Sequence, residues 1–410
     1  MADDAQYPVV NTTTGPMKGF VDTHRLSVHS TVKEQTKGDR VPIRKWLGFG
    51  GNFNSGGSNF PVYDPTEFVR QQSESGSPTI IVTVNYRVGI FGFLSTDDLL
   101  EVNGFPGNFG LHDCIQALEW TQKNIASFGG DPENVTAIGE SAGAFTISIL
   151  LHSGRKLFQK AILQSGSHTV MSYRQKPYYP IYDKLLGLLG VDPSLPPKER
   201  VAGLNNVPME ALREAAGKVF IPDIWGITAD PAEQGWKTSV WGQLERGEYD
   251  PWIQSILVTF NEDEGTFFSN RGKWWEGDTL KHVLKARGLL PSDEAYLQFR
   301  QLYGDDRLSE DKSNVKDLPA TKFLLFNAAS LWSYDDQTVD AKTAKTAGKY
   351  WSSFASSGDP GWGKCTFENG HAVKIGAGGK TTPFNVFKYH KAERDFFYPI
   401  VKALYTARDP

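Results

Sequence analysis

The chain has 410 residues, of which 39% are hydrophobic and 22% are charged, and its formal net charge is −4. This charge gives no reason to expect a nucleic acid or an anionic membrane as a partner, and no apolar run approaches the roughly 18 residues that span a bilayer. The acidic first six residues lack an apolar core, so we recognise no secretory leader there. Two cysteines, Cys114 and Cys365, cannot build a disulfide framework or a metal cluster. Two glycosylation sequons, at Asn11 and Asn134, could occur by chance, so they do not identify the cellular compartment of the protein.

The first third of the chain predicts strands and a helix in alternation. Residues 7–30 are expected to form short strands and turns. The run 46–53 is expected to be a strand that leads into a Gly-rich turn. Residues 79–87 are apolar, β-branched and nearly continuous, which predicts a strand buried on both faces. Apolar residues at helical spacing predict a helix over 111–128, which the breakers of 128–132 end.

The alternation continues through two further strands, and it favours a mostly parallel sheet covered by helices. We predict one domain over 1–410, with 180–250 as a helical cap over the sheet. The other elements that we expect are strands at 135–138, 160–166 and 255–260, helices at 144–151, 209–216, 347–356 and 395–405, and a hairpin turn at Asn369-Gly370.

The stretch Gly139-Glu140-Ser141-Ala142-Gly143 lies between an expected strand and an expected helix. Small residues two before and two after Ser141 let the chain turn sharply from strand into helix. The turn exposes the hydroxyl, and the following N–H groups face any negative charge that develops beside it. This context predicts a nucleophile elbow with Ser141 as the nucleophile, rather than a chance match in a loop.

A serine nucleophile needs a base, an acid that orients the base, and donors for an oxyanion. We predict the Ala142 N–H as one donor and the loop Gly50-Gly51-Asn52 as the source of the others; a plain turn is the alternative for that loop. Glu264 is the expected acid because it follows the strand 255–260, and open α/β sheets bind ligands at the carboxyl ends of their strands. A solvated acidic turn is the alternative for Glu264.

The base is not identified, although the chain has eight histidines. His152 lies eleven residues along the helix from Ser141, or about 16 Å at 1.5 Å per residue, and cannot reach it. We interpret His112, near the start of a helix, as a surface or capping residue. His282 is expected on a solvated face.

Three other histidines stay open as substitutes for the base. His168 follows a strand next to that of the nucleophile, at the correct end of the sheet. His371 and His390 follow Glu264, as the order serine, acid, histidine requires.

Two other site types can be set aside. Residues 376–381 (Gly-Ala-Gly-Gly-Lys-Thr) resemble the end of a phosphate-binding loop, but Lys374 stands where the first glycine of that motif would fall. No Cys/His cluster has zinc spacing. We therefore expect neither a metal nor a cofactor.

Together these residues resemble the type-B carboxylesterase/lipase family, which includes cholinesterases and fungal lipases. The resemblance implies an α/β-hydrolase fold: a mostly parallel central sheet with helices on both faces and a helical cap. It is strong from residue 41 to 167 and patchy elsewhere. The blocks that carry it are Asn85-Tyr86-Arg87-Val88-Gly89, Gly107-Asn108-Phe109-Gly110-Leu111, Phe128-Gly129-Gly130-Asp131-Pro132, Gly139 to Gly143, and Gln164-Ser165-Gly166.

The resemblance also implies roles for individual residues. Ser141 would be the nucleophile and Glu264 the acid. Gly51, Asn52 and Ala142 would be the oxyanion donors, with supporting residues behind them at Glu140 and Ser165. Asn52 departs from the family, which normally has a third glycine there.

Two family segments look absent, one between Thr23 and Arg25 and one between Phe326 and Tyr350, and the second would carry the catalytic histidine. The expected function is hydrolysis of a small-molecule or lipid carboxylic ester through an acyl-serine intermediate, with turnover depending on a base. The alternatives are a non-catalytic binding or adhesion module on the same fold and a chain that does not fold stably. Acyl and alcohol specificity and oligomeric state stay open.

Overall fold

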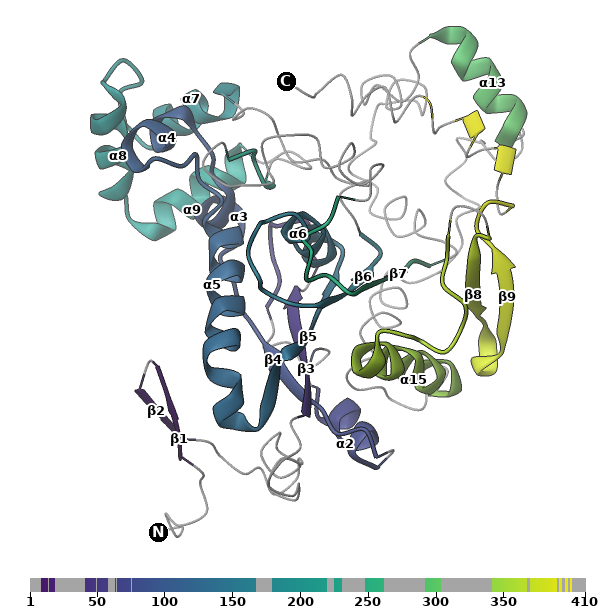
Figure 1. Ribbon diagram of the computed structural model, residues 1–410. Helices are drawn as coiled ribbons and strands as arrows, with labels where there is room; N and C mark the ends of the chain where they lie inside the picture. The colour runs from purple at the N-terminus through teal and green to yellow at the C-terminus, as the bar shows by residue number, and fades with distance from the viewer. Residues whose placement is uncertain are drawn as a thin grey trace.

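The computed structural model describes residues 9–13, 15–18, 41–48, 50–57, 63, 65–74, 76–166, 179–219, 225–230, 248–261, 292–303, 341–366, 369–388, 391–392, 395–396 and 399. Within these residues, the centre of the molecule is a sheet of five parallel strands in the order β4-β3-β5-β6-β7 (Figure 1). The strands are β3 (Val41–Gly48), β4 (Ile80–Thr83), β5 (Gly130–Glu140), β6 (Lys160–Gln164) and β7 (Ser255–Thr259).

Helices connect and cover these strands, as parallel neighbours require. The helices that precede β7 in the chain are α2 (Thr66–Glu74), α3 (Gly89–Phe93), α4 (Asp97–Asn103), α5 (Phe109–Asn124), α6 (Ala142–Leu150), α7 (Tyr179–Leu188), α8 (Pro197–Asn205) and α9 (Met209–Lys218). Those after it are α13 (Asp293–Tyr303) and α15 (Ala341–Ser357). Two separate antiparallel hairpins pair β1 (Val9–Thr12) with β2 (Gly15–Lys18) and β8 (His371–Ile375) with β9 (Thr381–Asn385).

Alternating side chains of the strands feed two cores on opposite faces of the sheet. Ala137 and Leu163 pack with α5 and α6 in the larger core, whereas Ile138 and Ile162 pack with α2 and α15 in the smaller one. Because both faces are buried, the strands read as continuous apolar runs.

A buried charge cluster joins α7 and α8 to α4. Asp98 of α4 is 5% exposed. Its carboxylate accepts from Tyr182 of α7 at 2.8 Å and from Arg200 of α8 through Nε at 2.6 Å and Nη2 at 2.5 Å. These bonds hold the pKa of Asp98 below its ordinary value, chiefly through Arg200. The three helices therefore form one unit beside α5 (Figure 1).

Most expected elements are confirmed, and two details differ. The strand expected at 79–87 stops at Thr83, since the segment that follows turns into α3. Asn369-Gly370 is not the turn of a hairpin: it precedes β8, and the β8–β9 turn lies at Gly376–Lys380 instead. The segment that resembles a phosphate-binding loop is thus a hairpin turn. Most of the helix expected at 395–405 lies outside the described residues.

Candidate active site

Ser141 is held in a strained backbone conformation between β5 and α6. Its φ of 50° and ψ of −117° lie where L-residues rarely occur, and such strain persists only where the surroundings enforce it. Here the Ser141 N–H donates to the Gln164 carbonyl at 2.9 Å, and the Ser141 carbonyl accepts from Phe145 N–H at 2.9 Å. A strand on one side and the first helical turn on the other thus fix the serine.

Glycines on either side of the turn let these elements close on each other. A Cβ placed on Gly139 would lie 2.4 Å from the Gly143 carbonyl carbon, and one on Gly166 would lie 2.5 Å from the Ser141 carbonyl oxygen. Neither neighbour is a flexible side chain, so a methyl group at Gly139 or Gly166 requires the backbone to move. The turn that the sequence predicts as an elbow is present.

The Gly-rich loop lies directly against the serine. A Cβ on Gly50 would lie 3.1 Å from Ser141 Cβ and 2.1 Å from Glu140 Oε2. The next three residues have positive φ: Gly51 at 102°, Asn52 at 52° and Phe53 at 61°. Asparagine tolerates this region better than most residues, which fits its presence where a third glycine was expected. The structure therefore brings the predicted donor loop and the predicted nucleophile together.

An aromatic contact, which sequence reasoning missed, fixes this loop to the elbow helix. Phe53 is fully buried, with its ring centroid 4.7 Å from that of Phe93 in α3 and 5.9 Å from that of Phe145 in α6. The Phe53 carbonyl also accepts from Gly89 N–H at 2.6 Å. In the sequence, the one indication of this contact is that an apolar residue, Phe53, follows the Gly-rich run.

Ala142, the third predicted donor residue, is the first residue of α6 and is fully buried. The first N–H groups of a helix have no partner within it and favour negative charge. Together with the loop at Gly51 and Asn52, this helix start can offer backbone donors to an oxygen that develops negative charge beside Ser141.

The two predicted supporting residues also lie beside the elbow. Glu140 is 5% exposed. Desolvation and then the Glu140 charge raise the pKa of Tyr63 to about 12. Desolvation chiefly raises the pKa of the buried Tyr86, and the Glu140 charge acts in the same direction. Ser165 also has a positive φ, 50°; its N–H donates to the Thr259 carbonyl at 2.8 Å, and its Oγ accepts from Asn261 Nδ2 at 3.4 Å.

Glu264, the predicted acid, lies outside the described residues, as do His168, His282 and His390. The strand that leads toward Glu264, β7, pairs with β6 in register, Gln164 opposite Thr259. Glu264 therefore follows a strand beside that of Ser165, but its own position stays a prediction.

The three described histidines lie elsewhere. His152 follows α6 at its far end, where Nδ1 lies 2.7 Å from the Glu248 carbonyl and the ring stacks on Tyr249. His371 is an exposed residue of the separate β8–β9 hairpin. No hydrogen bond joins any histidine of the described segments to Ser141.

His112 is neither a capping nor a fully exposed residue, which corrects our interpretation. The N-cap of α5 is Asn108, whose side chain exchanges two hydrogen bonds with the Thr228 backbone. The half-buried His112 faces the buried Asp230, with 3.9 Å between Nε2 and Oδ2. It therefore belongs to the junction between α5 and residues 225–230.

A partly buried carboxylate lies near the far end of α6. Asp250 accepts from Gly154 N–H at 3.0 Å, and desolvation raises its pKa to about 6. A helix C-terminus disfavours negative charge, so the position is an unfavourable one for a carboxylate.

The described residues hold no group of three or more His, Cys, Asp or Glu side chains that could bind a metal ion. None of the helices in the described segments combines the length and apolarity needed to cross a membrane.

Comparison with known proteins places this geometry in a family. Residues 8–273 match the model of the carboxylesterase family. Lipase 1 of Geotrichum candidum is 34% identical over 209 residues, which are 47% of this chain and 35% of the lipase. The para-nitrobenzyl esterase of Bacillus subtilis (strain 168) is 41% identical over 142 residues, 34% of this chain and 27% of that esterase. The chain thus spans about a third of the length of the curated relatives it matches.

Solved structures show the same fold. The Geobacillus stearothermophilus carboxylesterase EST55 at pH 6.8 aligns with a TM-score of 0.65 and 25% identity over 87% of this chain and 82% of its own. At pH 6.2 the same enzyme aligns with a TM-score of 0.69 and 22% identity over 94% of this chain and 99% of its own. The fold is that of the α/β-hydrolases, and the family model covers more than half of the sequence. The chain belongs to the carboxylesterase family.

Proposed function

We propose that this protein hydrolyses carboxylic esters through an acyl-serine intermediate on Ser141. The observation that carries the proposal is the strained Ser141 at the start of α6, with the Gly50–Asn52 loop packed against it. The backbone of Ser141 is held by hydrogen bonds to a strand and to the first turn of α6, which supports a site whose backbone amides need little reorganisation when an ester binds.

The proposed reaction has two steps. Ser141 Oγ attacks the ester carbonyl carbon and loses its proton to a base, while the carbonyl oxygen gains negative charge that the N–H groups of Gly51, Asn52 and Ala142 stabilise. The alcohol leaves with a proton, and water then cleaves the acyl-serine bond by the same route.

Glu264 is proposed to orient the base, and the base itself stays unassigned. His168 and His390 keep their places as candidates by sequence position. His371 lies in a hairpin outside the central sheet and therefore ranks below them. Loss of a triad base costs on the order of 10⁶ in rate in the subtilisin case, so the turnover number measures directly whether a base is present.

The substrate class is proposed to be a small or lipid ester. Support comes from the lipases and the para-nitrobenzyl esterase among the relatives. Residues 180–250 are proposed to act as a cap that selects the substrate, within a single domain over 1–410. The Asp98 cluster, which holds α7 and α8 beside α4, supports that assignment.

Turnover of short-chain p-nitrophenyl esters tests the proposal, with Ser141→Ala beside Ser148→Ala. Ser148 is the matched control because it lies in the same helix, is fully buried and donates only to the Phe145 carbonyl at 2.8 Å. We expect the wild type and Ser148→Ala to release p-nitrophenol with an initial burst and Ser141→Ala to lose both burst and turnover. A folded wild type with no activity beyond that of Ser141→Ala would contradict the proposal and favour a binding module.

Replacing His168, His371 and His390 by alanine one at a time then identifies the base. The variant that loses turnover while keeping a cooperative thermal transition carries it. If all three keep wild-type turnover, none of them is the base.

A further inference from the structure

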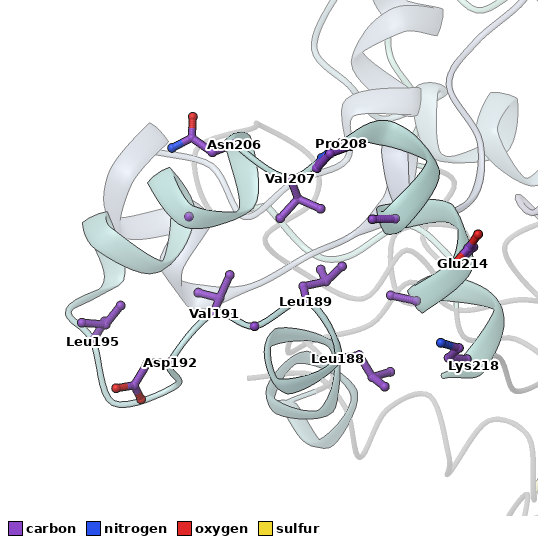
Figure 2. A pocket seen from close by; sticks show the side chains of 14 residues that line it. Leu188, Leu189, Val191, Asp192, Leu195, Asn206, Val207, Pro208, Glu214 and Lys218 are labelled. Atoms are coloured by element: carbon purple, nitrogen blue, oxygen red, sulfur yellow. The ribbon is translucent and has the colours of Figure 1, made fainter.

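The helices α7, α8 and α9 enclose an open groove of about 620 Å³, which we call the α7–α9 groove (Figure 2). Its lining combines apolar and polar residues, and the apolar ones include Leu188 and Leu189 around the end of α7 and Val207 and Ala211 around the start of α9. Leu188 is 43% exposed, so part of its side chain is open to a ligand in the groove. The volume lies within the roughly 300–1,000 Å³ typical of small-molecule sites.

The walls of the groove are held in place without a ligand. Tyr182 of α7 and Arg200 of α8 both bond to Asp98. Beneath the groove, Val191 and Leu204 pack with Leu186 in a small core. The groove is therefore largely preformed, as binding sites usually are.

The charges of the groove divide between its two ends (Figure 2). At one end the Asp192 carboxylate is already engaged, since it accepts from Ser194 N–H at 2.9 Å and Ser194 Oγ at 2.8 Å. At the other end Glu214 and Lys218 project from α9 one turn apart. Through their side chains they make no hydrogen bond or ion pair with each other or with another described residue. Among the described residues that line the groove, this end thus presents a carboxylate and an ammonium group that are not paired.

We propose that the α7–α9 groove binds a single-chain amphiphile with a zwitterionic head group, such as a monomeric alkylphosphocholine. The hydrocarbon chain would lie between the leucines of α7 and the apolar face of α9. The phosphate would contact Lys218 and the quaternary ammonium Glu214, so that both charges find a partner. A head group with a single charge would pair with one of these two side chains and lie beside the other, which carries the same charge as the head group. An uncharged head group would pair with neither Lys218 nor Glu214. None of the residues that line the groove belongs to the elbow or to the Gly50–Asn52 loop, and binding there does not require Ser141 to be a nucleophile.

Calorimetric titration with n-dodecylphosphocholine, kept below the concentration at which it forms micelles, tests the site on the full chain. Dodecanoate, dodecyltrimethylammonium and dodecyl maltoside carry the same chain on other heads and serve as comparisons. We expect saturable binding at one site, tighter for the zwitterion by about fivefold or more, which corresponds to about 1 kcal/mol. Equal affinity for all four heads would overturn the proposal, because it would indicate nonspecific association of the hydrocarbon chain.

Two pairs of variants locate the site. Ala211→Trp fills the groove and is expected to abolish binding, whereas Arg213→Trp, at a 70%-exposed side chain of the same helix, leaves it unchanged. Lys218→Glu alone is expected to weaken binding about tenfold, and the charge swap Glu214→Lys with Lys218→Glu to restore most of it. If Ala211→Trp does not fold, the charge variants still test whether the head group binds at Glu214 and Lys218. Unchanged affinity in Lys218→Glu would exclude the proposed head-group contacts.

Discussion

The elbow and the helices α7 and α9 contribute residues to the same core, but different forces fix the elbow and the α7–α9 region. At the elbow, positions depend on backbone hydrogen bonds and on glycines that have no room for a side chain, such as Gly50 and Gly139. In the α7–α9 region, several glycines have open space around them: a Cβ on Gly187 or Gly217 meets nothing within 4 Å. There a buried carboxylate, Asp98, holds the helices.

This difference predicts which substitutions each region tolerates. The elbow should be sensitive to added volume, since its neighbours are backbone atoms that cannot turn aside. The helices around the groove should be insensitive to added volume and sensitive to lost charge, because an unpaired buried charge is costly.

Gly139→Ala is expected to reduce the reactivity of Ser141 toward esters by more than about 100-fold, since displacement of an active-site group by about 1 Å can cost that much. The added Cβ would meet the Gly143 carbonyl carbon at 2.4 Å and push α6 from the strand. We expect the free energy of unfolding to fall by about 1–3 kcal/mol, as for overpacked cores. Ester turnover and urea denaturation measure the two effects.

Gly187→Ala is the matched control in α7. No atom lies within 4 Å of its added Cβ, and alanine is the better helix former by roughly 0.5–1 kcal/mol. We therefore expect higher stability and unchanged turnover. Destabilisation in both variants would remove the contrast between the regions.

Asp98→Ala is expected to lower the free energy of unfolding by roughly 3 kcal/mol, the lower end for a broken buried pair because the Arg200 side chain is 21% exposed. The loss leaves Arg200 without the carboxylate and the Tyr182 hydroxyl without its acceptor. Urea denaturation followed by circular dichroism checks the value.

Glu133→Ala removes an exposed ion pair for comparison. Lys156 and Glu133 have side chains 47% and 65% exposed, so we expect a change of only about 0–1 kcal/mol. A loss of similar size in Asp98→Ala would mean that the Asp98 cluster does not hold α7 and α8.

Asp250→Asn is expected to stabilise the protein at pH 7.5 and to have only a small effect at pH 4, close to the ordinary pKa of an aspartate. Burial raises the pKa of Asp250 to about 6, so the folded state binds a proton more readily than the unfolded state does. Stability from this group is therefore present at low pH and is lost as pH rises through about 6. Allowing for solvent screening of a half-buried group, we expect a gain of about 1 kcal/mol at pH 7.5. Thermal melts at both pH values measure it.

Asp192→Asn should show the opposite sign. Hydrogen bonds from Ser194 hold the pKa of Asp192 below its ordinary value, so its contribution is present at neutral pH and is lost on acidification. A small loss of thermal stability at pH 7.5 that disappears in acid is the expected result. The same sign in both variants would show that these local hydrogen bonds and burial do not set the two pKa values.

Local patterns in the sequence predicted the elbow well. The spacing Gly139, Ser141, Gly143 implies small neighbours and a turn, and Ser141 indeed has the required positive φ. Runs of apolar residues located β5, β6 and β7 within a few residues, apart from the early start of β5 at Gly130. For β6, which is buried along its whole length, this is the continuous apolar signature of a strand covered on both faces.

Contacts between distant residues could not be predicted in the same way. Asp98 meets its partners across 84 and 102 residues of sequence, and nothing in the local pattern near Asp98 distinguishes it from a solvated helix-start acid. His112 was misread for the same reason, since Asp230 lies far along the chain. The contact between Phe53 and Phe145 likewise depends on how the Gly-rich loop packs against α6.

The most direct measurement of the central claim is labelling with a fluorophosphonate, followed by peptide mass spectrometry. Wild type, Ser148→Ala and Ser141→Ala would be treated side by side after their thermal transitions are confirmed. We expect one adduct per chain, on Ser141, in the wild type and in Ser148→Ala, and none in Ser141→Ala. A folded wild type without an adduct on Ser141, or labelling that persists in Ser141→Ala, would contradict the assignment of Ser141 as the nucleophile.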